Sequence, residues 1–287
     1  MHYKNHPYEE ITMRPYIITL SSEKGGVGKT TVATNLAIYL KALCEDLPVT
    51  IFSFDNHFTV DRLFRISKES ANKKDILHLF AGDPAQELTE LGQFGVQFVP
   101  SSRRLPEVRE LLTDAASFAR LLAASRLSGI VIIDTRPDLD PFTLNALFTS
   151  DRVIVPVKDL PSLENCKYLY DFFDRAKLSR RAVRLLPCLI DARIRFEGPF
   201  RDMRQLLRAY AINRGYRCME VCITRSPKVD SLQTNPDGKV YPIISYGQNS
   251  DVHNQFTQLA RQVLQDYRNE PARRLGQIAG DADPLEL

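Results

Sequence analysis

The chain has 287 residues, of which 44% are hydrophobic and 25% are charged. These are the proportions of an ordinary globular protein, so they exclude a disordered, collagenous or fibrous chain. The formal net charge of +3 is too small to indicate a binding partner by itself. Five cysteines without a C-x-x-C pair favour reduced thiols and a cytoplasmic location over a disulfide framework.

Short apolar segments alternate along the chain with segments in which apolar residues recur at helical spacing. Residues 1–14 are polar and are expected to form a flexible leader. The predicted strands are residues 17–22, 49–54, 96–100, 130–134, 152–157, 183–190 and 219–223. The predicted helices are residues 29–44, 75–81, 118–124, 142–148, 163–176, 200–214 and 250–267.

This alternation predicts the fold class. Strands that are apolar throughout are buried on both faces, as the strands of a parallel sheet are. Strands that alternate with helices indicate an α/β fold, a doubly wound, mostly parallel sheet with helices on both faces. We therefore expect one domain over residues 15–268, followed by a mobile C-terminal tail over residues 269–287.

A glycine-rich segment, E-K-G-G-V-G-K-T-T at residues 23–31, lies between the first predicted strand and the first predicted helix. Glycines allow backbone N–H groups to converge on phosphate oxygens, and the start of the helix adds a positive dipole end. Lys29 would reach the β- and γ-phosphates, and the Thr30 hydroxyl would ligate Mg²⁺. The residues predicted to surround the phosphates are Gly25, Gly26, Val27, Gly28, Lys29, Thr30 and Thr31. The alternative is a glycine turn that binds nothing.

The segment K-G-G-V-G-K-T-T resembles the deviant Walker A loop of the ParA/MinD group of ATPases, and the resemblance extends over roughly residues 15–268. VTIFSFD at 49–55 is similar to the family's second-strand motif, and GIVIIDTRPDLDPFTLNAL at 129–147 is similar to its Walker B region. Residues 223–247 are similar to an arginine-containing loop of the ParA branch. The resemblance implies a P-loop NTPase fold, ATP and Mg²⁺ as cofactors, and slow, partner-stimulated hydrolysis of ATP.

The resemblance also implies roles for single residues. Lys24 matches a signature lysine that reaches the ATP of a second subunit in a homodimer. Asp134, at the end of an apolar strand, matches the carboxylate associated with Mg²⁺, and Asp55 matches the residue that orients the attacking water. A surface lysine, a capping aspartate and a turn residue are the respective alternatives. Family members often read D-x-D-P-Q where this chain reads D-N-H-F-T, so His57 replaces the second acid.

Basic residues are concentrated between positions 175 and 217, where twelve arginines and lysines stand against three acids. Arg201, Arg204 and Arg208 would share one face of the helix predicted at 200–214. Such a face is typical of contacts to a phosphate backbone, and the ParA branch binds DNA non-specifically as an ATP dimer. The three arginines are therefore predicted to bind DNA. A solvated surface is the alternative.

We therefore predict a ParA-like, Mg-ATP-dependent dimerising ATPase that positions or segregates DNA with a ParB-like activating protein, in the cytoplasm or at the nucleoid. The tail carries no amphipathic basic helix of the kind that anchors the MinD branch, so no membrane binding is expected. One alternative is an ATP-dependent switch that positions a non-DNA cargo. Another is a ligase or amidase of the dethiobiotin or cobyrinate type, which Lys24 disfavours. Cys218 and Cys222 have no third cysteine nearby and do not suggest an iron–sulfur cluster.

Overall fold

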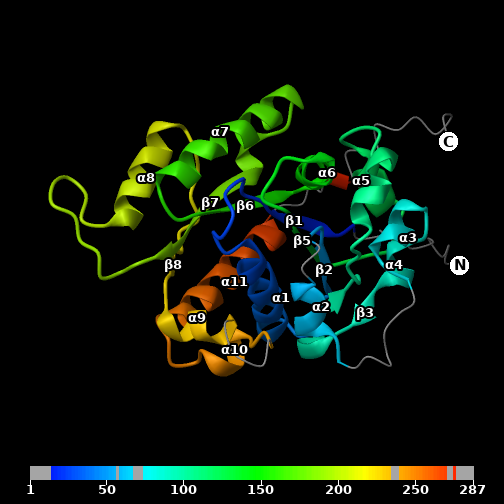
Figure 1. The fold of residues 1–287 in the computed structure, drawn as a ribbon, viewed down its shortest axis with the longest axis horizontal. Coiled ribbons are helices and arrows are strands. Elements are labelled where there is room, and N and C mark those ends of the chain that lie inside the picture. The colour runs from blue at the N-terminus through cyan, green and yellow to red at the C-terminus, as the bar shows by residue number, and fades with distance from the viewer. Residues whose placement is uncertain (1–13, 56–57, 67–73, 234–238, 270–273, 276–287) are drawn as a thin grey trace, which may run out of the picture.

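A computed structural model describes residues 14–55, 58–66, 74–233, 239–269 and 274–275 (Figure 1). Its centre is a sheet in which eight described strands follow the order β3-β4-β2-β5-β1-β6-β7-β8. Neighbouring strands are parallel, except for the antiparallel pair β3 and β4. The strands are β1 (Tyr16–Leu20), β2 (Val49–Ser53), β3 (Glu90–Leu91), β4 (Gln97–Phe98), β5 (Ile130–Asp134), β6 (Arg152–Val157), β7 (Val183–Ile190) and β8 (Ile223–Thr224).

Helices cover both faces of this sheet, which confirms the predicted fold class. The α-helices are α1 (Lys29–Leu43), α2 (Thr59–Phe64), α3 (Ile76–Phe80), α4 (Ala85–Leu88), α5 (Ser117–Ala123), α6 (Pro141–Thr149), α7 (Leu160–Arg175), α8 (Met203–Asn213), α9 (Pro227–Gln233), α10 (Ile243–Tyr246) and α11 (Asp251–Asn269). Short 3₁₀ turns lie at Gln93–Gly95, Leu105–Leu111 and Arg180–Ala182. Figure 1 shows α1 and α11 together on one side of the sheet and α5, α6 and α7 on the other.

The alternation of side chains along the central strands explains these two layers. Ile18 and Ile132 pack in one buried cluster with α1 and α11, whereas Ile17 and Val131 pack in another with α5 and α6. Successive residues of a strand point to opposite faces, so a strand with apolar residues at every position needs a helix layer on each side. The central strands are therefore buried, and their carboxyl ends are held rigidly at one edge of the sheet.

The predicted strand at 219–223 is largely wrong. Met219 N donates to Leu185 O at 2.8 Å, but Glu220 N turns away and donates to Gln262 Oε1 on α11 at 3.3 Å. The chain rejoins the sheet only at Ile223, where β7 carries an irregularity in its pairing. An apolar run therefore predicted a continuous strand where a side chain of α11 takes one backbone N–H out of the ladder.

The ends of two predicted segments also need correction. Helix α8 begins at Met203, because the Asp202 side chain accepts the Gln205 N–H at 2.9 Å and caps it, so Arg201 lies before the helix. Within the expected mobile tail, Asn269 still belongs to α11, and Leu275 is fully buried in the cluster beneath α5 and α6. The leader residues 1–13 and the tail residues 270–273 and 276–287 lie outside the described residues.

Candidate functional site

The loop that follows β1 borders a cleft of about 560 Å³ at the carboxyl ends of the central strands. In the strand order, β2 lies to one side of β1 and β6 lies to the other, so the order of strands reverses its direction at β1. Open α/β sheets bind ligands at such a switch point. The cleft is lined by Gly25, Gly26, Gly28, Lys29, Thr30, Thr31, Asp55, Arg136, Pro137, Leu189, Val229 and Asp230. The fold therefore brings most of the predicted phosphate loop and Asp55 to one cavity.

Two glycines give the loop its shape. Gly26 has a φ of +65° and Gly28 a φ of +92°, a left-handed backbone that residues with a side chain rarely adopt. Gly28 caps the start of α1 without any side-chain hydrogen bond to the first turn. The free N–H groups at the start of a helix, together with its dipole, favour an anion. The loop and α1 thus form a site for phosphate groups.

Lys29 and Asp134 are the buried charges of this site. Lys29 is 8% exposed, and its Nζ donates to Ser22 O at 3.1 Å. Burial lowers the pKa of Lys29, while Asp134, Asp55 and Asp138 oppose that shift. An ammonium group held at this position by a backbone carbonyl is able to move to a stronger partner, such as a phosphate oxygen.

Asp134 is fully buried at the end of β5, and its Oδ2 accepts the Thr30 hydroxyl at 2.8 Å. Burial raises the pKa of Asp134 to about 7, although the Thr30 hydrogen bond opposes this. The second carboxylate oxygen, Oδ1, is buried without a hydrogen-bond partner among the described residues. A hydroxyl beside a carboxylate with an unsatisfied oxygen fits Mg²⁺, which prefers oxygen ligands. Thr30 and Asp134 are therefore the residues that could hold the metal.

Asp55 lies two residues after the end of β2 and lines the same cleft. The preceding Phe54 N donates to Asp134 O at 2.9 Å, so the ends of β2 and β5 are fixed to each other. Asp55 N donates to Ser53 Oγ at 3.2 Å, and this orders the turn. The position agrees with a residue near the terminal phosphate, but its role in orienting water stays a prediction. His57 lies outside the described residues.

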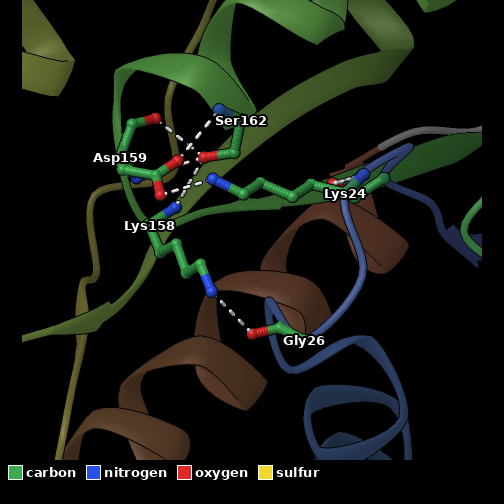
Figure 2. A network of polar contacts seen from close by, with 6 residues as sticks. Lys24, Gly26, Lys158, Asp159 and Ser162 are labelled. Atoms are coloured by element: carbon green, nitrogen blue, oxygen red, sulfur yellow. Dashed lines mark hydrogen bonds and ion pairs between the residues drawn. The ribbon is translucent and has the colours of Figure 1, made fainter.

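Lys24 is held by α7 and is not among the residues that line the cleft. Its Nζ lies 2.6 Å from Asp159 Oδ2, the N-cap carboxylate of α7, whose Oδ1 also accepts the Ser162 N–H at 2.9 Å (Figure 2). Burial would raise the pKa of Asp159, but the hydrogen bonds from Lys24 and Ser162 keep it below its usual value. Lys158 Nζ donates to Gly26 O at 3.3 Å in the same network. Two lysines thus connect the phosphate loop to the start of α7.

Two of the three arginines of the predicted DNA face donate side-chain hydrogen bonds within the chain. Arg208 donates to Met219 O at 2.8 Å and also to Glu220 O, while Arg204 donates to Glu220 O at 3.3 Å. Both guanidinium groups therefore brace the irregular segment between β7 and β8 against α8. Arg201 is exposed, outside the helix. DNA binding by these residues stays a prediction.

Sequence reasoning missed Arg136, a basic residue of the cleft. It stands two residues after Asp134, so the two-residue period of a strand would have placed both side chains on the same side. Two further residues line the cleft from other elements. Leu189, with a φ of +56°, belongs to β7, the strand predicted at 183–190, whereas Asp230 belongs to α9, a helix that the apolar pattern does not predict.

A central parallel strand, a glycine loop, a following helix and a buried aspartate beside a loop threonine define a P-loop nucleotide-binding protein. Residues 15–182 match the family model AAA_31, described as an AAA domain. The chain is 32% identical over 141 residues to the chromosome-partitioning ATPase Soj of Thermus thermophilus, which covers 49% of this chain and 54% of that relative. It therefore spans about half the length of that relative.

A second relative covers nearly the whole chain. The chromosome partitioning protein ParA of Myxococcus xanthus is 28% identical over 277 residues, which is 90% of this chain and 92% of that protein. Cobyrinic acid a,c-diamide synthase from Mycobacterium smegmatis, with a bound ATP analogue and magnesium, is a solved structure of similar fold. Its TM-score is 0.66 at 18% identity, over 89% of this chain and 96% of that one. The chain belongs to the ParA/MinD family of P-loop ATPases.

Among the described residues, no helix combines the length and the apolar character that crossing a bilayer requires.

Proposed function

We propose that this chain binds Mg·ATP in the cleft beside α1 and hydrolyses it. The observation that carries the proposal is the unsatisfied Oδ1 of the buried Asp134, which lies beside Thr30 at the base of the glycine loop. A buried carboxylate oxygen without a partner is costly unless a ligand or metal completes it. A cleft of 560 Å³ falls within the range of small-molecule and cofactor sites.

Different residues of the cleft bind the phosphates, Mg²⁺ and the attacking water. The loop N–H groups and Lys29 hold the phosphates, while Thr30 and Asp134 hold Mg²⁺, which when bound neutralises charge on the phosphates. Asp55 orients the attacking water from the end of β2. Because Lys29 donates to a carbonyl of its own loop, it exchanges one hydrogen bond for a stronger, charge-assisted one when phosphate binds.

Dimerisation forms part of the proposal through Lys24. For Lys24 to reach the nucleotide of a second subunit, its ion pair with Asp159 has to open. Both side chains are 30% exposed, and such a pair contributes about 0–1 kcal/mol. An ion pair of this strength holds Lys24 in the monomer but yields readily to phosphate groups. ATP would therefore favour a homodimer, and hydrolysis would release it.

Non-specific DNA is the proposed partner, with partition or positioning of DNA as the task and a ParB-like protein as activator. The relatives whose names refer to chromosome partitioning support this, as does the excess of basic residues between positions 175 and 217. This function predicts a protein at the nucleoid.

The second candidate is an ATP-dependent switch for a non-DNA cargo. The contacts of Arg204 and Arg208 with backbone carbonyls favour it, because guanidinium groups that already donate within the chain have fewer donors to offer DNA phosphates.

The test combines molecular mass with DNA retention. Light scattering should show a dimer with Mg²⁺ and a slowly hydrolysed ATP analogue, and a monomer with ADP. Lys24→Ala should stay a monomer with either nucleotide, and an unchanged mass for the parent protein with all nucleotides would reject the dimer. DNA retention should need the analogue and should weaken with salt, with a log–log slope that falls by about 0.9 for each phosphate that a substitution leaves unbound. A dimer that does not bind DNA at low salt supports the second candidate.

A further inference from the structure

Arg136 is a cation of the nucleotide cleft that the proposed binding of phosphates and Mg²⁺ does not use. Its side chain lines the cleft with Lys29, Thr30 and Asp55, and it is half-buried. In the part of the chain that the structure describes, its guanidinium makes no hydrogen bond or ion pair, although other arginines such as Arg152 and Arg208 do. A half-buried guanidinium without a partner is available to a ligand of the cleft.

The backbone on both sides of Arg136 is fixed. Thr135 N donates to Leu20 O at 3.3 Å and its hydroxyl donates to the same oxygen at 2.8 Å, so pairing with β1 continues one residue beyond β5. Pro137 follows, and a proline disfavours helical backbone and favours extended backbone in the residue before it. Because side chains alternate along extended chain, Arg136 projects to the same side as Asp134, the side of Thr30 and α1.

Where the structure describes it, the cleft has few basic residues with which to bind a triphosphate. Among its described lining residues, only Lys29 and Arg136 are basic, while Asp55 and Asp230 are acidic. Lys24 is paired with Asp159 at the start of α7. A triphosphate needs several positive partners, and the cleft of a single subunit provides these two in addition to the loop N–H groups.

We propose that Arg136 binds the terminal phosphate of ATP held by the loop of its own subunit. This inference rests on the proposed function, since it assumes that the cleft takes ATP. Lys29, Thr30 and the loop hold the inner phosphates, and Arg136 approaches from the end of β5 with two donors that match the oxygens of a phosphate. Arg136 distinguishes ATP from ADP and does so in the monomer, before Lys24 leaves Asp159.

The test is a calorimetric titration of the protein in the presence of Mg²⁺, first with a slowly hydrolysed ATP analogue and, separately, with ADP. It compares the parent protein, Arg136→Ala, Arg136→Lys and Arg126→Ala, a control that removes an exposed arginine between α5 and β5. Each variant is also made with Lys24→Ala, so that binding is measured without the dimer. Removal of one charge-assisted hydrogen bond to phosphate should weaken analogue binding about 10- to 100-fold in Arg136→Ala. The affinity of Arg136→Ala for ADP should change less than about 3-fold. The affinity of Arg136→Lys for the analogue should lie between those of the parent protein and Arg136→Ala.

Each result decides the matter. Equal losses of affinity for the analogue and ADP would show that Arg136 acts on the overall charge of the cleft, and no loss would show that it contacts neither nucleotide. A loss of affinity that disappears in the Lys24→Ala background would place the contact across a dimer. All three overturn the proposal while leaving ATP binding intact. If the parent protein binds neither nucleotide, the proposed function fails, and this inference fails with it.

Discussion

Replacing Asp134 by asparagine should stabilise the protein in the absence of nucleotide and metal. The parent carboxyl is fully buried, and burial raises its pKa from 3.8 to about 7. The difference is about three pKa units at 1.36 kcal/mol each, so the ionised carboxylate costs about 4 kcal/mol of folding free energy above pH 7. The introduced asparagine would keep an oxygen for Thr30, but its buried amide N–H groups would cost about 1–3 kcal/mol if unpaired. A net gain of about 1–3 kcal/mol remains.

The pH dependence is the sharper observable. At pH values between the pKa of Asp134 in the unfolded chain and its higher pKa in the folded protein, the folded protein keeps the proton and the unfolded chain has lost it. The parent protein therefore loses stability as the pH rises through this window, and the asparagine variant does not. The difference in free energy of unfolding should therefore grow by about 2–3 kcal/mol between about pH 5 and pH 8.

Urea unfolding with a metal chelator and without nucleotide measures this difference. Asp138→Asn, which removes an exposed acid from the following loop, controls for the loss of one negative charge. A stability difference between parent and Asp134→Asn that is the same at both pH values would refute the argument that Asp134 is a costly buried carboxylate kept for a ligand.

Three further predictions concern binding, dimerisation and stability. Lys29→Ala should lose most of its affinity for Mg·ATP, because the buried ammonium has no substitute in the loop, and unchanged affinity in a nucleotide titration would reject the loop assignment. Asp159→Ala should free Lys24 and shift the ATP-dependent dimer to protein concentrations a few-fold lower, since the ion pair contributes at most about 1 kcal/mol; light scattering over a dilution series would show no shift if the pair is irrelevant. Arg208→Ala should lower the free energy of unfolding by about 1–3 kcal/mol, because it removes hydrogen bonds to two backbone carbonyls. Arg204→Ala, at an exposed position, should lower it less. The reverse order of the two variants in urea unfolding would contradict the bracing role.

The phosphate loop and Asp134 could be predicted from sequence because their signals are local. The loop stands between an apolar strand and a helical segment, and Asp134 ends an apolar run, so each position follows from its neighbours along the chain. The parallel sheet follows in the same way from strands that are apolar at every position.

Contacts between distant segments could not be predicted in this way. The pair of Lys24 and Asp159 joins residues 135 positions apart, and nothing around either residue indicates the other. The partners of Arg208 lie in a segment whose apolar pattern predicted strand, and its departure toward Gln262 depends on how α11 packs. Helix periodicity placed Arg208 on a basic face but did not show that its guanidinium group already donates to two backbone carbonyls of the same chain.

Calorimetric titration of the protein with a slowly hydrolysed ATP analogue, once with Mg²⁺ and once with a chelator, tests whether Thr30 and Asp134 hold the metal of an ATP-binding cleft. We expect one site per chain, tighter binding with Mg²⁺ than without, and loss of the Mg²⁺ effect in Asp134→Asn although that variant is folded. Binding that does not respond to Mg²⁺ in the parent protein, or an Asp134→Asn variant with the parent's Mg²⁺ response, would contradict the assignment of Thr30 and Asp134 as the metal site of an ATP-binding cleft.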